Sequence, residues 1–218
     1  MLKEVKAIFL DYTGTMVRED DEDTMKLLKI FLTNSDFKTP DEALNAVWGL
    51  IKKIEHECYL DKFIMKDEMV DRILDICEKE YHFVADKQMT HEIWAHSWVH
   101  APLFDDVRPF FEKYADKIYV VTNDDYKYVE ESMRLKNLSP KGIISAEAVR
   151  ACKPHGEILE EALRVSGVLP AEAVLIGDSV TSDVSCARTV GIRPIIVDRK
   201  CKTKSDEFTV INSLTDLL

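Results

Sequence analysis

The pattern of apolar residues divides the chain into short strand-like runs and longer amphipathic segments. Four runs are mostly apolar without alternation, which is typical of strands covered on both faces in a parallel sheet. They are Ala7–Leu10, Ile118–Val121, Ala173–Ile176 and Pro194–Val197, and Gly142–Ser145 is a weaker candidate. The chain therefore contains enough strands for one buried sheet.

Amphipathic segments of helical length separate the later runs. They are Tyr126–Lys136, Gly156–Ser166 and Thr181–Val190. Because strand and helix alternate, this part of the chain predicts an α/β fold with a doubly wound, Rossmann-like parallel sheet.

A long helical stretch interrupts this rhythm after the first strand. Residues 39–42 are Thr-Pro-Asp-Glu, which places an N-cap, a proline at the first helical position and a capping-box glutamate in order. Two further helices are predicted from about Lys66 and over Lys87–Val99. We therefore expect an all-helical cap at about 18–100. The α/β core then consists of residues 1–17 and 101–218.

Composition limits the classes of partner. The chain has 218 residues, 46% of them hydrophobic, and 29 basic against 40 acidic residues give a formal net charge of −11. This charge argues against binding to nucleic acid or to an anionic membrane, and it leaves the oligomeric state open. The five cysteines form no CxxC pair, and reduced thiols in the cytoplasm are the simplest account of them.

Polar residues follow the predicted strands. Asp11, Thr122 and Asp178 lie at or just beyond three strand ends, Asp198 follows a fourth, and Lys153 precedes a helix. Ligands of open α/β sheets bind beyond the carboxyl ends of the strands. Carboxylates gathered there need a hard cation such as Mg²⁺. The nearby lysine and hydroxyl suit a second, anionic guest such as phosphate.

Four motifs in order resemble those of the haloacid dehalogenase (HAD) superfamily. FLDYTGT, residues 9–15, resembles the nucleophile motif DxDGT, and VVTND contains the strand-end threonine. CKPHGEIL contains the motif lysine, and GDSVTSD, residues 177–183, resembles the acidic motif GDxxxxD. The resemblance covers nearly the whole chain outside the cap. It implies a magnesium-dependent phosphatase-type hydrolase.

The resemblance also implies a role for each motif residue. Asp11 forms an aspartyl phosphate, and magnesium is held by Asp11, the Thr13 carbonyl and Asp178. Asp183 supports the site by orienting Lys153 or a metal-bound water. The residues expected to contact the small phosphorylated substrate are Gly14, Thr15, Thr122, Asn123 and Lys153.

Position 13 departs from the pattern, because most phosphatases of this superfamily carry a second aspartate there. That aspartate acts as a general acid and base, a contribution typically worth ~10²–10⁴-fold in rate. With Thr13 in its place, three readings stay open. The protein is a slow or specialised phosphatase, it acts on a carbon–phosphorus or carbon–halogen bond, or it is a weakly active binder of phosphate or a partner. Lys52 on the cap is the candidate Schiff-base lysine for the carbon–phosphorus reading.

Overall fold

The strands of residues 2–218, the range that this computed structural model describes, form a six-stranded sheet. Every neighbouring pair is parallel, and the order is β3-β2-β1-β4-β5-β6. This order reverses direction at β1, so the predicted doubly wound α/β fold is confirmed. The strands are β1 (Ala7–Leu10), β2 (Ile118–Thr122), β3 (Gly142–Ser145), β4 (Ala173–Gly177), β5 (Arg193–Val197) and β6 (Thr209–Ile211).

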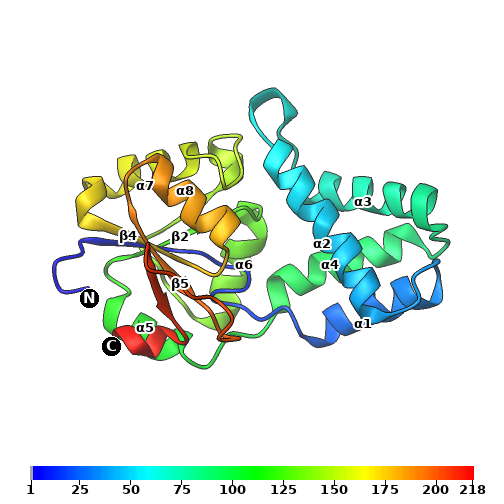
Figure 1. Cartoon of the computed structure of the whole chain (residues 1–218), viewed down its shortest axis with the longest axis horizontal. Helices are drawn as coiled ribbons and strands as arrows, with labels where there is room; N and C mark the ends of the chain where they lie inside the picture. Colours follow the sequence, from blue (N-terminus) through cyan, green and yellow to red (C-terminus); the bar gives the residue numbers. More distant parts are fainter. Residues whose placement is uncertain (1) are drawn as a thin grey trace.

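Helices cover both faces of the sheet (Figure 1). Alternate residues of β1 point to opposite faces: Ile8 and Leu10 pack in the cluster that includes α5 and α6, whereas Ala7 and Phe9 pack with α7 and α8. This double burial explains why the strands are apolar without alternation. The helices are α5 (Val107–Tyr114), α6 (Tyr126–Lys136), α7 (Glu157–Ser166) and α8 (Ser185–Thr189).

Four further helices lie together beside the carboxyl edge of the sheet (Figure 1), and we call this group the cap. Thr39 caps α2 by accepting a hydrogen bond from the Glu42 amide at 3.2 Å, and Pro40 begins the helix, as the sequence predicts. Phe31, Ile73 and Trp94 belong to the buried cluster that holds these helices together. They are α1 (Glu22–Thr33), α2 (Pro40–Glu57), α3 (Lys66–Tyr81) and α4 (Lys87–His100).

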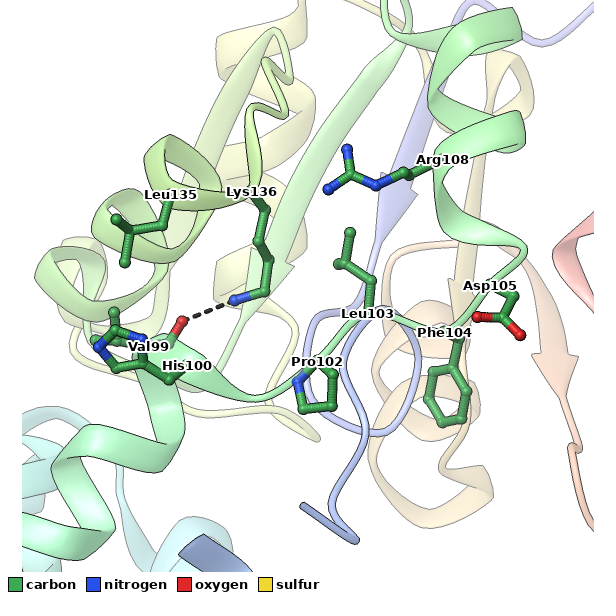
Figure 2. A pocket seen from close by; sticks show the side chains of 9 residues that line it. All are labelled: Val99, His100, Pro102, Leu103, Phe104, Asp105, Arg108, Leu135 and Lys136. Atoms are coloured by element: carbon green, nitrogen blue, oxygen red, sulfur yellow. Dashed lines mark hydrogen bonds between the residues drawn. The ribbon is translucent and has the colours of Figure 1, made fainter. Parts of the chain in front are cut away.

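The chain leaves and re-enters the core through two adjacent connections. The Arg18 amide donates to the Pro102 carbonyl at 2.8 Å, and the Phe104 amide donates to the Met16 carbonyl at 3.0 Å. Figure 2 shows the hollow beside the returning connection, where Lys136 of α6 donates to the Val99 carbonyl at 2.7 Å. These contacts fix the position at which α4 meets the core.

The structure differs from the sequence-based elements in four places. Helices α1 and α5 and strand β6 are not among the individually predicted elements. The predicted helix Thr181–Val190 consists of a π turn, Val180–Val184, followed by the short helix α8. Single π turns occur frequently at functional sites. Among residues 2–218, no helix has the length and apolarity needed to cross a bilayer.

Candidate active site

The residues singled out from the sequence meet at the carboxyl ends of β1, β2 and β4. A cavity of about 910 Å³ lies between this edge and the cap, and its walls include Asp11, Thr122, Lys153 and Asp178. Strands β1 and β4 are neighbours at the point where the strand order reverses. Ligands of doubly wound sheets bind at that point, so the cavity is the candidate active site.

Lys153 holds the two buried acids together. Its Nζ donates to Asp11 Oδ1 and to Asp183 Oδ1, both at 2.6 Å, and to the Val121 carbonyl at 3.3 Å. Burial alone lowers the pKa of Lys153, but the adjacent charges of Asp11 and Asp183 outweigh burial and leave the pKa raised. The side chain is therefore an ammonium ion in the folded protein.

The carboxylates outnumber the cation that faces them. Oxygens of Asp11, Asp178 and Asp183 all lie within 4.8 Å of one another. Burial raises the pKa of Asp11 and of Asp178, and the charges of neighbouring carboxylates add to this effect. One ammonium cannot balance three carboxylates. This excess of oxygen donors fits a hard divalent cation, with Asp178 open to the cavity as a ligand.

Two glycines allow the backbone to approach these acids. Gly14 has φ +82°, and a Cβ at this position would lie 2.6 Å from Asp178 Oδ2. A Cβ at Gly177 would lie 2.3 Å from the Asp183 carboxyl carbon. Any larger residue would displace a carboxylate, which explains the two motif glycines physically.

Asp183 has little free capacity for a metal. Its Oδ1 accepts from Lys153, and its Oδ2 accepts from the Ser179 amide at 3.0 Å. The π turn directs its side chain back towards the sheet, where it is 2% exposed. This placement matches the supporting role that the resemblance implies.

Position 13 is linked to an acid that the motif analysis did not assign to the site. The Thr13 hydroxyl donates to Asp124 Oδ2 at 2.8 Å, and the Thr122 hydroxyl donates to the same oxygen at 2.9 Å. Asp124 is 6% exposed and lies in the cavity wall. Its spacing of two residues from Thr122 was the available signal.

The other expected substrate contacts occupy two kinds of position. The Thr15 hydroxyl donates to Asp11 Oδ2 at 2.8 Å and so fixes the orientation of that carboxylate. Asn123 lines the cavity, but its side chain accepts from the Lys153 amide at 2.7 Å and donates to the Lys153 carbonyl at 3.2 Å. Asn123 therefore positions Lys153. Asp198 lies outside the cavity lining and accepts hydrogen bonds from the loop that follows it.

The cap contributes a buried ion pair at the edge of the site. Lys66, the first residue of α3, lies 2.8 Å from Glu55 Oε1 and 3.4 Å from Asp124 Oδ1. The sequence did not reveal this cluster, because Glu55 and Asp124 come from separate elements, the cap helix α2 and the loop after β2. Lys66 thus joins the cap to Asp124, which accepts a hydrogen bond from Thr13.

Glu19 also faces the cavity, from the connection between core and cap. Its side chain is exposed to the water of the cavity, and the walls of the cavity surround it. This burial, with the charges of Asp11 and Asp124, raises the pKa of Glu19 to about 7. The sequence analysis assigned no role to Glu19.

Comparisons with known proteins agree with this geometry. The profile of the haloacid dehalogenase-like hydrolases matches residues 5–191. A curated relative, haloacid dehalogenase-like hydrolase domain-containing protein 3 from Xenopus laevis, is 29% identical over 112 residues, which are 50% of this chain and 46% of that protein. The match therefore spans about half of the relative's length.

Solved structures show the same fold at low identity. The HAD-hydrolase YfnB from Bacillus subtilis, bound to magnesium, has a TM-score of 0.76 at 19% identity, with 99% of this chain and 97% of that chain covered. L-2-haloacid dehalogenase from Xanthobacter autotrophicus has a TM-score of 0.77 at 16% identity, with 98% and 96% covered. A HAD phosphatase from Thermococcus onnurineus has a TM-score of 0.65 at 21% identity, with 98% and 96% covered.

The matched range, residues 5–191, includes all four motifs in order, and the structure brings their residues to one edge of the sheet. The chain therefore belongs to the haloacid dehalogenase-like hydrolase family.

Proposed function

We propose that the protein is a magnesium-dependent phosphatase that acts on a small phosphomonoester through a phosphorylated Asp11. The arrangement of Asp11 carries this proposal. Lys153 and Thr15 hold its two carboxylate oxygens, at 2.6 and 2.8 Å, in the wall of the cavity. The open carboxylate of Asp178 lies beside it. This arrangement pairs a fixed nucleophile with a site for a cation.

The first chemical step belongs to Asp11. A carboxylate oxygen attacks phosphorus, a new O–P bond forms, and the alkoxide leaves with the electrons of the old bond. Lys153 places positive charge beside the transferring group, and the Thr122 hydroxyl is within the same wall. Magnesium held by Asp11, Asp178 and the Thr13 carbonyl would offset the charge on the phosphoryl oxygens.

The second step is attack of water on the phosphoenzyme. Thr13 cannot remove a proton from that water at neutral pH, because a hydroxyl is far too weak a base. The hydroxyl is also committed to Asp124. We therefore expect the phosphoenzyme to persist longer than in a phosphatase with aspartate at position 13.

The cap side of the cavity favours an organic group of low polarity. Leu28, Trp48 and Ile51 line it above the acidic floor. Apolar contact of this kind stabilises a bound group by roughly 25 cal/mol per Å² buried. Glu19 and Glu55, also in the lining, disfavour a substrate with several negative charges. Monophosphates with an aliphatic or aromatic body fit best.

A panel of phosphomonoesters tests the proposal. We expect turnover with magnesium, its loss with chelator, and its loss in Asp11→Asn, which keeps the shape but removes the nucleophilic charge. An activated aryl phosphate belongs in the panel because its leaving group needs no general acid. Absence of both turnover and phosphoenzyme would refute the phosphatase and leave the ligand-binding reading.

A second candidate rests on Lys52. It lines the same cavity as Asp11 and Thr13, so an amine and a nucleophile face one space. A Schiff base at Lys52 would support cleavage of a carbon–phosphorus bond. Borohydride trapping with phosphonoacetaldehyde distinguishes this candidate, because trapping and turnover must both disappear in Lys52→Ala. The same panel with 2-haloacids tests carbon–halogen cleavage.

A further inference from the structure

Two buried cysteines meet where the cap contacts the core. Cys58 follows the last residue of α2, and Cys152 immediately precedes Lys153. Each side chain is 1% exposed. Cys152 is the first residue of the quoted stretch CKPHGEIL, but no motif role is assigned to either thiol. The two cysteines lie where the cap, which moves in the proposed catalytic cycle, meets the segment that carries Lys153.

The backbone around these cysteines forms a short antiparallel pair. Tyr59 pairs with Ala151 in an antiparallel bridge. The Leu60 amide donates to the Arg150 carbonyl at 2.7 Å, and the Cys152 amide donates to the Cys58 carbonyl at 3.0 Å. In this register Cys58 and Cys152 lie directly opposite each other and on the same face.

This register suits a disulfide. Opposite residues of an antiparallel pair have Cα atoms about 4.5–5.5 Å apart, inside the range of about 4.4–6.8 Å that disulfides use. The two thiols are close enough for each to shift the pKa of the other. The sulfur of Cys58 also accepts from the Ile64 amide at 3.4 Å. Small side-chain rotations can therefore bring the sulfurs into bonding distance.

The surroundings distinguish the roles of the two thiols. The neighbouring Cys152 thiol lowers the pKa of Cys58, and the Ile64 amide and the Lys66 ammonium act in the same direction, against the opposing effect of burial. The neighbouring Cys58 and burial raise the pKa of Cys152. Thiolates, and not thiols, attack oxidants. Cys58 is therefore the attacking residue and Cys152 the resolving one.

We propose that Cys58 and Cys152 are a redox modification site, at which a peroxide forms a reversible disulfide that fastens the cap to the core. The Cys58 thiolate attacks one peroxide oxygen, which gives a sulfenic acid and expels hydroxide. Cys152 then attacks the sulfenic sulfur, the S–S bond forms and a second hydroxide leaves. The two thiol protons complete two molecules of water, and two electrons pass to one peroxide. A dithiol reductant reverses the reaction.

The disulfide would stop turnover by holding the cap down. Cys58 belongs to the segment between α2 and α3, whereas Cys152 is covalently next to Lys153, whose Nζ contacts Asp11. A bond between them would tie the end of α2 to the loop before Lys153 and so restrict the cap opening that substrate entry requires in the proposed cycle. Because Cys58 is 1% exposed, its oxidation also requires this contact to open. This effect on turnover rests on the proposed function, whereas the cross-link does not.

Thiol mapping tests the cross-link directly. The full chain carries Cys201→Ser, which removes the exposed cysteine, and is treated with hydrogen peroxide, alkylated and digested without reductant. We expect a peptide pair joined through Cys58 and Cys152, and alkylated Cys77 and Cys186 after denaturation. Free thiols at both positions, or a sulfinic acid at Cys58 without a joined pair, would overturn the proposal.

Two variants distinguish inhibition by the Cys58–Cys152 disulfide, which we call the lock, from general oxidative damage to the protein. Cys58→Ser should form no cross-link and keep its aryl phosphate turnover after peroxide, whereas the parent loses at least tenfold and recovers with dithiothreitol. Cys77→Ala, which removes a buried cap cysteine, should behave as the parent. Equal peroxide losses in Cys58→Ser, or full turnover in the cross-linked parent, would overturn the lock.

A readout independent of turnover separates failure of the lock from failure of the proposed phosphatase. Oxidation should slow amide hydrogen exchange at least tenfold over residues 59–64 in the parent and leave Cys58→Ser unchanged. Unchanged exchange in the cross-linked protein would refute the lock even if no substrate were found. Cys58→Ala serves as a second variant if the serine protein does not fold.

Discussion

Replacing Gly14 with alanine places a methyl group against the carboxylate of Asp178. The new Cβ would lie 2.6 Å from Asp178 Oδ2 and 2.9 Å from its Cγ, so the carboxylate must retreat by about 0.8 Å to reach an ordinary contact of 3.4 Å. Magnesium accepts ligand distances only near about 2.0–2.1 Å. The substitution should therefore remove Asp178 from the proposed magnesium ion while leaving every site side chain in the protein.

The cost of the backbone conformation must be separated from this clash. Gly14 has φ +82°, and a non-glycine residue there costs about 1–2 kcal/mol. Gly167 provides the control, because it has φ +70° but nothing within 4 Å of its Cβ position. Both alanine variants should lose about 2–8 °C in Tm from the backbone, at ~2–4 °C per kcal/mol for a chain of this size.

Thermal unfolding with and without magnesium measures the difference. A ligand at ~100 times its Kd stabilises a protein by about 2.7 kcal/mol, which corresponds to roughly 5–10 °C here. Wild type and Gly167→Ala should show this rise, and Gly14→Ala should not. A full magnesium response in Gly14→Ala would refute the assignment of Asp178 as a ligand.

Three further predictions address the surroundings of Asp11. Thr13→Asp should accelerate hydrolysis of the phosphoenzyme by up to ~10²–10⁴-fold. The effect should be clearest when Thr13→Asp is combined with Asp124→Asn, because Asp124 Oδ2 lies 2.8 Å from the Thr13 hydroxyl and would repel a new carboxylate. An unchanged single-turnover rate would show that water is activated elsewhere. Lys66→Met should destabilise the protein by about 3–5 kcal/mol, since it leaves Glu55 and Asp124 without their cation. Urea unfolding measures this loss, and Glu55→Gln in the same chain should restore part of it. Because the pKa of Glu19 is raised to about 7, the stability it contributes is present below about 4.5 and lost as pH rises through about 7. Glu19→Gln should therefore raise the free energy of unfolding by up to ~1 kcal/mol at pH 8, a figure reduced for the water in the cavity, and leave it unchanged at pH 4. Equal differences between the variant and wild type at both pH values would contradict this.

The strand ends were predictable because burial and connectivity leave few choices. Ala7–Leu10 is too apolar for an exposed strand, and a parallel strand must be followed by a crossover. Asp11 and Asp178 therefore reach the same edge whatever the loops do. Their distance of less than 4.8 Å follows from the adjacency of β1 and β4, which the sequence implies through the motif order but does not measure.

Contacts between the cap and the core were not predictable in the same way. Lys66 and Asp124 are 58 positions apart and belong to elements with no shared pattern. The Cys58–Cys152 pairing has the same origin, because it depends on how the segment after α2 settles against the loop before α7. Tertiary packing decides such contacts, and the hydrophobic periodicity of the sequence does not predict them.

The break in the last predicted helix has a local physical cause. Asp183 must turn back towards Lys153, and its Oδ2 also accepts from the Ser179 amide. The backbone meets both demands with a π turn, Val180–Val184, before α8 begins. The apolar pattern of Thr181–Val190 fitted a regular helix because the pattern does not register hydrogen bonds to a buried acid.

The most direct test of the account is detection of the phosphoenzyme. The protein is mixed with magnesium and an aryl phosphate, quenched in acid within the first turnover and digested for peptide mass analysis. We expect a phosphoryl group on the peptide that contains Asp11, absent from Asp11→Asn and lost on further incubation. Turnover without any phosphoryl group on that peptide, or the group on another residue, would contradict it.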